Sequence, residues 1–330
     1  MKVAIVGAGT TGAYCYRLLR KQGLQVDIFD RTPKTACGIN PCAWGTSRGF
    51  TEQLRTAGLD PEKYILQRFD SVIMDEVRIQ GELMTINKPA LIRDLLGEAK
   101  VKGEPFEMAD YGRVIDATGV ARAFLPPIKN DVLLPCVQLR IQPKRKFENR
   151  IQLGKLGYAW CFPLGEFGVH IGCGSLVSNP KKMLEEVGWL GNPSPSSGQK
   201  PACACSGNVR LTGPHDAIPF VSERRGTPVW GIGEAIGCVA PLAGDGIVPG
   251  MKSVSLLVDN WENREGYTRS ILKEFEWMKN ERTVIDKILA ATPIGIKDAW
   301  VLRKNSKRMG MRVGMKEAVK FLKMLRLAGI

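Results

Sequence analysis

The sequence predicts an α/β fold that combines a parallel, nucleotide-binding sheet with an inserted antiparallel sheet and a helical C-terminus. Three observations predict it. A short apolar run at residues 3–6 leads into a glycine-rich turn, which is how many nucleotide-binding units begin. Short alternating segments punctuated by Gly and Pro occupy residues 126–205 and are typical of antiparallel strands. Residues 261–330 have mainly helical patterns.

The first thirty residues carry a dinucleotide-binding fingerprint. Gly7, Gly9 and Gly12 follow the first predicted strand and open a predicted helix that stops at Gly23. The first glycine permits a tight turn, the second lets the backbone approach a pyrophosphate, and the third lets helix and strand pack closely. The helix N-terminus offers N–H groups to the phosphates. Asp30 ends the second predicted strand at the spacing of a carboxylate that holds a ribose 2′-hydroxyl, so the motif fits NAD or FAD.

The remaining elements follow from apolar periodicity and turn residues. Residues 31–47 are irregular and rich in Gly, Pro, Thr and Cys, which is typical of a functional loop. The other expectations, in chain order, are a short helix at 51–57, strand-like residues at 71–79, a helix from Pro89, a strand at 113–119, strands within 136–142, 158–165 and 167–177, a surface loop at 192–201, a return to parallel-sheet character at 227–237 and a helix at 247–261.

These elements predict three regions. Residues 1–125 and 206–260 form a discontinuous cofactor-binding domain, and residues 126–205 form an antiparallel substrate domain. Residues 261–330 form a helical, basic C-terminal segment.

Two further pieces identify the nucleotide as FAD. The strand at 113–119 ends in Asp-Ala-Thr-Gly at Gly119, and residues 233–247 read GEAIGCVAPLAGDGI. An NAD dehydrogenase needs only the first fingerprint, so the three together indicate an FAD-binding Rossmann-like fold of the glutathione-reductase or hydroxylase type. The turn at Gly246 precedes a helix starting near Ile247, whose N-terminal partial charge would stabilise negative charge on a reduced flavin. Glu234 would reach the ribityl or pyrophosphate region.

Three motifs together resemble the geranylgeranyl reductase family of flavoproteins, including its archaeal digeranylgeranylglycerophospholipid reductases. They are Cys-Gly at 37–38, YAWCFP at 158–163, which matches the family's Tyr-x-Trp-x-Phe-Pro signature, and GEAIGCVAPLAGDGI. The resemblance covers most of residues 1–260. It implies an FAD-dependent oxidoreductase that saturates prenyl chains, as this family does in archaeal lipids and in chlorophyll and quinone biosynthesis.

The resemblance also implies roles for individual residues. Tyr158 and Trp160 would line the cavity beside the flavin, and Cys37 would face the reacting alkene. Glu234 and Lys88 depart from the family pattern, which has Asp and Arg at these places, and the chain is shorter than typical members. Contacts with FAD are implied for Thr11, Asp30, Arg31, Cys37, Gly38, Lys88, Gly246 and Ile247.

The chemistry of alkene reduction requires a hydride for one carbon and a proton for the other. Flavin N5 supplies the hydride, and a nearby acid must supply the proton. A thiol with an ordinary pKa of about 8.5 is mostly protonated at neutral pH. Cys37 is therefore the first candidate acid and Tyr158 the second, with a purely structural Cys37 as the alternative.

Charge and cysteine content bear on the partners of the protein and on its cellular location. The net charge is +14, and residues 297–330 hold ten Lys or Arg against two acids, a balance of +8 (10 − 2). This bias implies an anionic partner, which could be lipid headgroups, nucleic acid, an acidic electron carrier or a phosphorylated substrate, with a solvated basic face as the equally weighted alternative. Nine cysteines without a disulfide spacing, and no apolar run long enough for a bilayer, predict a cytoplasmic protein, peripheral on the inner face of the membrane if its substrate is a lipid. Residues 315–330 have helical apolar spacing with a basic face, which fits either a membrane surface or docking on the core.

Several alternatives remain open at this stage. The scaffold also suits an FAD-dependent monooxygenase or halogenase, or a basic flavin-binding module without turnover; nucleic acid is disfavoured because aromatic residues are sparse in the basic tail. With no second dinucleotide fingerprint, the reductant is NADPH, a ferredoxin or a reduced deazaflavin. Buried thiols are the default for Cys203 and Cys205, with a redox pair or an iron–sulfur cluster including Cys37 and Cys42 as the less favoured alternatives, and no metal is expected.

Overall fold

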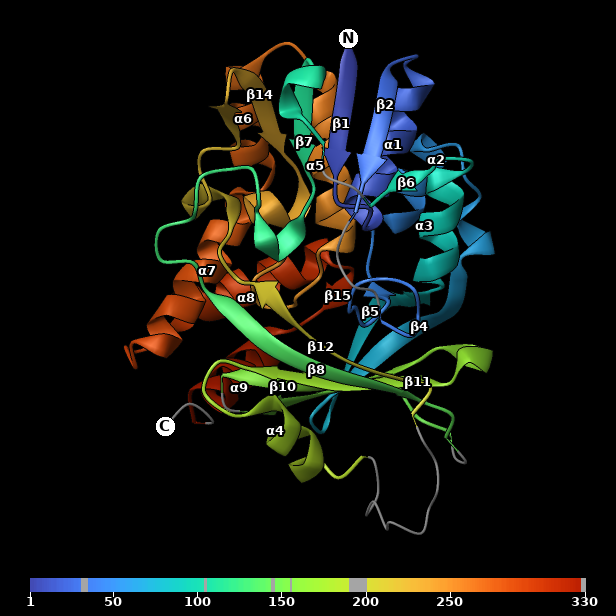
Figure 1. Ribbon diagram of the computed structural model, residues 1–330. Helices are drawn as coiled ribbons and strands as arrows, with labels where there is room; N and C mark the ends of the chain where they lie inside the picture. Colours follow the sequence, from blue (N-terminus) through green and yellow to red (C-terminus); the bar gives the residue numbers. More distant parts are fainter. Residues whose placement is uncertain (31–34, 104–105, 144–145, 155, 190–200, 328–330) are drawn as a thin grey trace.

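The computed structural model describes residues 1–330 apart from 31–34, 104–105, 144–145, 155, 190–200 and 328–330. Arg31 and most of the loop predicted at 192–201 lie outside these described residues. Two sheets dominate the fold, one above the other in Figure 1.

The six-stranded sheet is built around the fingerprint strand. Its order is β13-β14-β7-β1-β2-β6, and all pairs are parallel except β13 with β14. β1 is apolar and buried on both faces, as the central strand of a parallel sheet must be. The bounds are β1 Lys2–Val6, β2 Gln25–Phe29, β6 Val101–Lys102, β7 Arg113–Asp116, β13 Val221–Arg224 and β14 Thr227–Gly231.

The nine-stranded sheet is mainly antiparallel. Its order is β12-β8-β11-β10-β9-β4-β5-β15, with β3 paired to β5 and one parallel pair, β4 with β9. The strands are β3 Gly45–Thr46, β4 Ile65–Met74, β5 Val77–Ile86, β8 Leu133–Ile141, β9 Arg150–Gly154, β10 Gly157–Pro163, β11 Val169–Ser175, β12 Cys203–Arg210 and β15 Met311–Arg312. β4 and β5 thus join this sheet although they come from residues expected in the cofactor-binding region.

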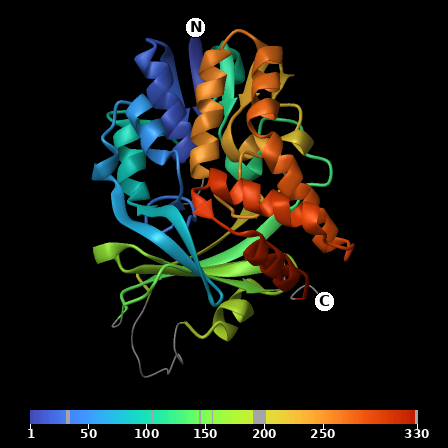
Figure 2. The ribbon, with the colours of Figure 1, turned by 180° about the vertical axis from the view of Figure 1, so that it is seen from behind.

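Helices pack on one face of the parallel sheet, the face turned toward the viewer in Figure 2, and others lie lower in the molecule near the larger sheet. Figure 2 shows α5 beside α1, and the two helices are in contact. Asn87 accepts a hydrogen bond from the backbone N–H of Ala90 (3.1 Å) and caps α3, so this helix begins next to the predicted start at Pro89. The helices are α1 Thr10–Lys21, α2 Phe50–Thr56, α3 Lys88–Leu96, α4 Pro180–Glu186, α5 Ile247–Asp259, α6 Arg264–Glu274, α7 Glu276–Leu289, α8 Ile296–Arg308 and α9 Met315–Leu327.

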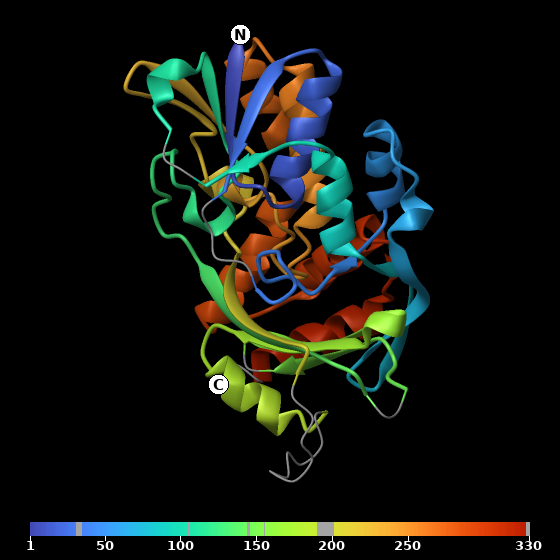
Figure 3. The same cartoon turned by 45° about the vertical axis from the view of Figure 1, so that its right-hand side comes forward.

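The C-terminal helix α9 docks on the protein. Ala318, Phe321 and Leu322 are buried against Val72 and Ile79 of the larger sheet, while Lys316, Lys320 and Lys323 are exposed. This segment was expected either to lie on a membrane surface or to dock on the core, and its apolar face is docked on the core. The side chain of Leu325 lies outside the described residues. Figure 3 shows the red C-terminal helices on one side of the larger sheet and α4 on the other. No helix in the described part of the chain has both the length and the apolarity required to cross a bilayer.

Candidate active site

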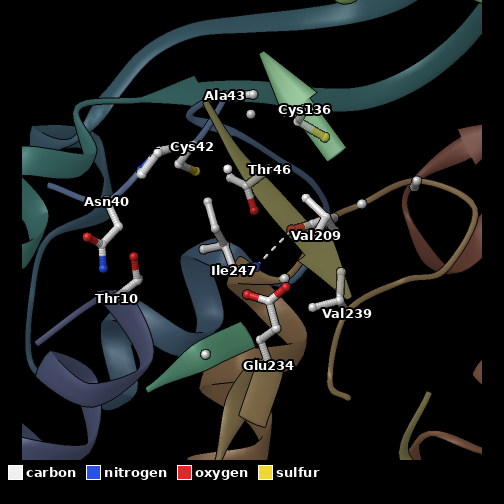
Figure 4. A pocket seen from close by; sticks show the side chains of 18 of the residues that line it. Thr10, Asn40, Cys42, Ala43, Thr46, Cys136, Val209, Glu234, Val239 and Ile247 are labelled. Carbon is white, nitrogen blue, oxygen red and sulfur yellow. Dashed lines mark hydrogen bonds between the residues drawn. The ribbon is translucent and has the colours of Figure 1, made fainter. Parts of the chain in front are cut away.

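A cavity of about 800 Å³ lies where the two sheets face each other, within the roughly 300–1,000 Å³ of ligand sites. Its walls come from the glycine loop after β1, the loop at 40–47, strands of the larger sheet, the turn at 239–247 and the helices α7 and α8. Figure 4 shows part of this lining from close by.

The glycine loop has the close packing that its sequence predicts. Gly7 has φ +107°, and a Cβ there would lie 2.2 Å from the carbonyl oxygen of Ala117 at the end of β7. A Cβ on Gly12 would lie 1.9 Å from the carbonyl oxygen of Gly7. The first bond of α1 runs from the Ala13 N–H to the Gly9 carbonyl (2.9 Å), so the N–H groups before it have no partner within the helix. The loop therefore presents a helix N-terminus to the cavity.

Three polar atoms in the cavity wall have no hydrogen-bond partner within the protein. They are Thr10 Oγ1, Asn40 Oδ1 and Thr46 Oγ1, all buried and all on residues that line the cavity. Figure 4 shows Thr10 and Asn40 close together, with Thr46 on the other side of Ile247. An unpaired buried polar atom costs about 1–3 kcal/mol, so this wall fits a ligand that carries several hydrogen-bonding groups. An FAD molecule is such a ligand.

Glu234, which is partly exposed, and the buried Arg210 form a polar pair at one edge of the cavity. The Glu234 carboxylate accepts a hydrogen bond from the Arg210 N–H (2.8 Å), and the Arg210 guanidinium is held by Asp131 (2.9 Å). Burial raises the pKa of Glu234, while the hydrogen bond and the charge of Arg210 oppose that rise. Gly119 packs beside this pair, since a Cβ there would lie 3.5 Å from Glu234 Oε2.

Asp245 is a second carboxylate, at the start of α5. It accepts hydrogen bonds from Ser47 Oγ (2.8 Å) and from the Ile247 N–H (3.0 Å), which joins the loop at 40–47 to the turn before α5. Burial raises its pKa. The charge of Lys88 lowers the pKa of both Asp245 and Glu234, so this cation lies within electrostatic range of both.

Tyr158 and Trp160 project from β10 into the cavity, because residues two apart on a strand share a face. Their ring centroids are 5.9 Å apart. The Tyr158 hydroxyl donates to the Ala243 carbonyl (2.8 Å), and burial raises its pKa far above the usual range. The Trp160 indole donates to Gln138 Oε1 (3.1 Å), and Gln138 Nε2 donates to the Cys42 carbonyl (3.0 Å). Tyr158 is thus tied to the turn before α5, and Trp160 is tied through Gln138 of β8 to the loop at 40–47.

The far part of the cavity is apolar. Side chains from β4, β5, β9 and α8 line it, among them Met74, Leu83, Leu153 and Leu302. One carboxyl group stands in this apolar part: Glu281 of α7 is 3% exposed and accepts a hydrogen bond from the Leu242 N–H (3.2 Å). Burial raises the pKa of Glu281 to about 7.

Most of the residues predicted for the site are brought together here. Those that line the cavity are Gly7, Gly9, Thr11, Gly12, Asp30, Lys88, Gly119, Tyr158, Trp160, Glu234, Gly246 and Ile247. Their contacts with a cofactor stay a prediction.

Cys37 and Gly38 are not among the residues that line the cavity, so their contacts with the flavin and the alkene stay a prediction. Thr35 accepts hydrogen bonds from the N–H groups of Cys37 (3.2 Å) and Gly38 (2.8 Å), and this tight turn leaves the Cys37 thiol hydrogen-bonded to Cys203. The thiols that do line the cavity are Cys42, Cys136 and Cys205.

Four functional candidates were missed by the sequence reasoning. Asp245 lies between two glycines of a motif already singled out, so that motif carried a signal for it. Asn40 and Thr46 belong to the loop expected to carry function, but nothing in its composition distinguishes them. Glu281 is a single acid in a helix with no motif around it, and only the tertiary structure reveals its burial.

The two facing sheets and the glycine-lined cavity give this chain the fold of flavin-dependent oxidoreductases. It is similar to a geranylgeranyl bacteriochlorophyll reductase-like protein of Thermoplasma acidophilum, with a TM-score of 0.68, 18% identity and 98% of each chain covered. A flavoprotein/dehydrogenase of Cytophaga hutchinsonii matches with a TM-score of 0.62, 12% identity and 91% and 92% coverage. The resemblance predicted from the sequence is therefore confirmed at the level of the fold.

Two sequence comparisons agree with this fold. The model of the NAD(P)-binding Rossmann-like domain matches residues 5–39. An uncharacterized protein of Methanocaldococcus jannaschii is 24% identical over 334 aligned positions, which cover 87% of this chain and 90% of the relative.

Proposed function

We propose that this protein is an FAD-dependent reductase that saturates carbon–carbon double bonds of isoprenoid lipids or their precursors. The observation that carries the proposal is one continuous cavity with two kinds of wall. Unpaired buried polar atoms and a helix N-terminus lie at one end, and apolar side chains lie at the other. Such a cavity suits a polar cofactor held against a hydrocarbon chain.

The residues present fit FAD. The N-terminus of α1 suits the pyrophosphate, and Asp30, whose carboxylate accepts a hydrogen bond from the Ala8 N–H (3.4 Å), suits a ribose hydroxyl. Thr10, Asn40 and Thr46 supply the unpaired polar atoms. When bound, the flavin supplies the hydride for one alkene carbon.

The proton for the other alkene carbon must come from a group in the cavity. Cys37 is not in the cavity lining, and Tyr158 holds its proton too tightly. Glu281 lines the apolar end, and its pKa of about 7 matches neutral conditions, where a general acid works best. Glu281 therefore replaces Cys37 as the candidate acid.

A single-turnover experiment tests the proposal. The FAD-loaded protein is reduced with dithionite and mixed with a geranylgeranyl lipid, and the product is followed by mass in steps of two daltons. We expect the wild-type protein to add hydrogen to the lipid. We expect Glu281→Gln to retain flavin but to reduce the lipid at least tenfold more slowly. A preparation that binds no FAD, or a reduced protein that leaves the lipid mass unchanged, refutes the proposal.

The reductant and the surface that meets it belong to the same proposal. The excess of basic residues at 297–330 supports an acidic donor protein such as a ferredoxin, with NADPH or a reduced deazaflavin as the other donors. The exposed lysines of α9 support contact with an anionic membrane. Co-sedimentation with anionic and neutral vesicles at two salt concentrations tests this contact. Equal binding to the two kinds of vesicle would contradict it.

A monooxygenase or halogenase is the second candidate function. The observation that favours it is the likeness to CmlS, a flavin-dependent halogenase, with a TM-score of 0.60, 13% identity and 99% and 71% coverage. Oxygen consumption in the presence of FAD and NADPH, together with an unreduced lipid, would support this alternative over the reductase.

A further inference from the structure

Four of the nine cysteines meet beside the cavity although they come from two distant segments. Cys37 and Cys42 belong to the loop after β2, and Cys203 and Cys205 belong to β12, where positions two apart share a face. Gln138, paired with Cys205 in the sheet register, joins the two segments. Its Nε2 donates to the Cys42 carbonyl (3.0 Å) and lies 3.9 Å from Cys205 Sγ.

Cys203 is the centre of this cluster. Its thiol hydrogen-bonds with the Cys37 thiol on one side and with the Cys205 thiol on the other. Cys203 is only 5% exposed, whereas Cys37 is half-buried and so reachable from solvent. Cys42 and Cys205 line the cavity, and Figure 4 shows the Cys42 sulfur in the cavity wall.

The surroundings of the two outer thiols differ. The Arg140 guanidinium lowers the pKa of Cys37, although burial raises it by more. Burial raises the pKa of Cys205 to about 12, which keeps this thiol protonated and unreactive. Cys37 is therefore mostly a protonated thiol, and its advantage as the attacking group is its partial exposure beside the positive charge of Arg140. Within the described ranges, no group of three or more His, Cys, Asp or Glu side chains is arranged to hold a metal ion.

We propose that Cys37 and Cys203 form a reversible dithiol–disulfide couple that ties the loop at 35–44 to β12. The oxidant is a low-molecular-mass disulfide. The Cys37 thiolate attacks one of its sulfurs and releases a first thiol, and Cys203 then attacks the Cys37 sulfur and releases a second. Two protein S–H bonds are lost, one S–S bond forms, and two electrons and two protons end on the reagent. Oxidation would fix two walls of the cavity to each other.

The test is redox equilibration of the folded, FAD-loaded protein with mixtures of reduced and oxidised glutathione, followed by acid trapping, alkylation and peptide mapping. We expect a cross-link two daltons lighter than the two reduced peptides, 35–48 and the peptide containing 203–210. It should require both Cys37 and Cys203 and disappear on return to reduced glutathione. Cys37→Ser and Cys203→Ser should each abolish it, whereas Cys161→Ser, a buried thiol on β10, should leave it intact.

Several outcomes would overturn the proposal. These are glutathione adducts without a cross-link, a disulfide between Cys203 and Cys205 that persists in Cys37→Ser, or stoichiometric iron or zinc in the isolated protein. If Cys203→Ser fails to fold, as its flavin content would reveal, Cys37→Ser alone decides, because Cys37 is in a half-buried loop.

Discussion

Replacing Glu281 by Gln should change how the stability of the protein depends on pH. Glu281 is 3% exposed, and burial raises its pKa from about 4.5 to about 7. The folded state therefore binds the proton more tightly than the unfolded state does. Its stabilising contribution is complete below about pH 4.5 and is lost as pH rises through about 7. Glutamine keeps an oxygen that accepts from the Leu242 N–H, but it has no proton to lose.

The size of the effect follows from the two proton affinities. A tenfold difference corresponds to about 1.4 kcal/mol, so complete ionisation of Glu281 costs the folded state about 3 kcal/mol. Between pH 5.5 and pH 8, the free energy of unfolding of Glu281→Gln should rise by about 2 kcal/mol relative to wild type.

Urea unfolding of the FAD-saturated protein at these two pH values provides the measurement. Glu185→Gln, at an exposed position of α4, is the matched control and should follow the wild-type pH dependence. If Glu281→Gln also runs parallel to wild type, Glu281 is not a buried acid with a raised pKa, and its proposed role as proton donor loses its basis.

Three further substitutions test other parts of the site. Gly12→Ala should lower both flavin content and melting temperature, because its Cβ would lie 1.9 Å from the Gly7 carbonyl oxygen; unchanged values would contradict the packing described here. Thr10→Val should raise the melting temperature of the apoprotein, by removing an unpaired buried hydroxyl, yet weaken FAD binding roughly 5- to 100-fold, as titration can show. If Thr10→Val instead leaves the affinity for FAD unchanged, FAD does not contact Thr10. Tyr158→Phe should cost about 1 kcal/mol in urea unfolding through loss of the bond to Ala243 and retain FAD; loss of flavin would assign Tyr158 to the cofactor instead.

The local parts of the fold could be predicted from sequence because their signals are local. Gly7 and Gly12 must be glycine for reasons that the backbone alone dictates, and the structure has those contacts. The alternation in residues 158–163 likewise predicted a strand, and the family resemblance predicted that Tyr158 and Trp160 line the cavity, as they do. Strand pairing between distant segments has no such signal. β4 joins the larger sheet through a parallel pair with β9, about 75 residues later, and no local pattern near either strand specifies that partner.

Cys37 illustrates the same limit within the site. Family resemblance indicated the loop, but the turn at Thr35 and the partner thiol of Cys203 decide where its side chain lies. In an irregular loop, two side chains only a few residues apart can face different surroundings, since no periodic pattern determines which of them point into the cavity. That is why Cys42 lines the cavity and Cys37 does not.

The C-terminal segment is part of the site rather than an addition to it. Leu302 and Ser306 of α8 line the cavity, as does Met309 directly after this helix, and Glu281 reaches it from α7. α9 in turn buries Phe321 against the same sheet whose other side chains face that cavity. Because these helices present their apolar side inward, their excess positive charge is left on the outer surface. One segment therefore both lines the apolar end of the cavity and carries exposed basic residues, so these two properties lie on opposite faces of the same helices.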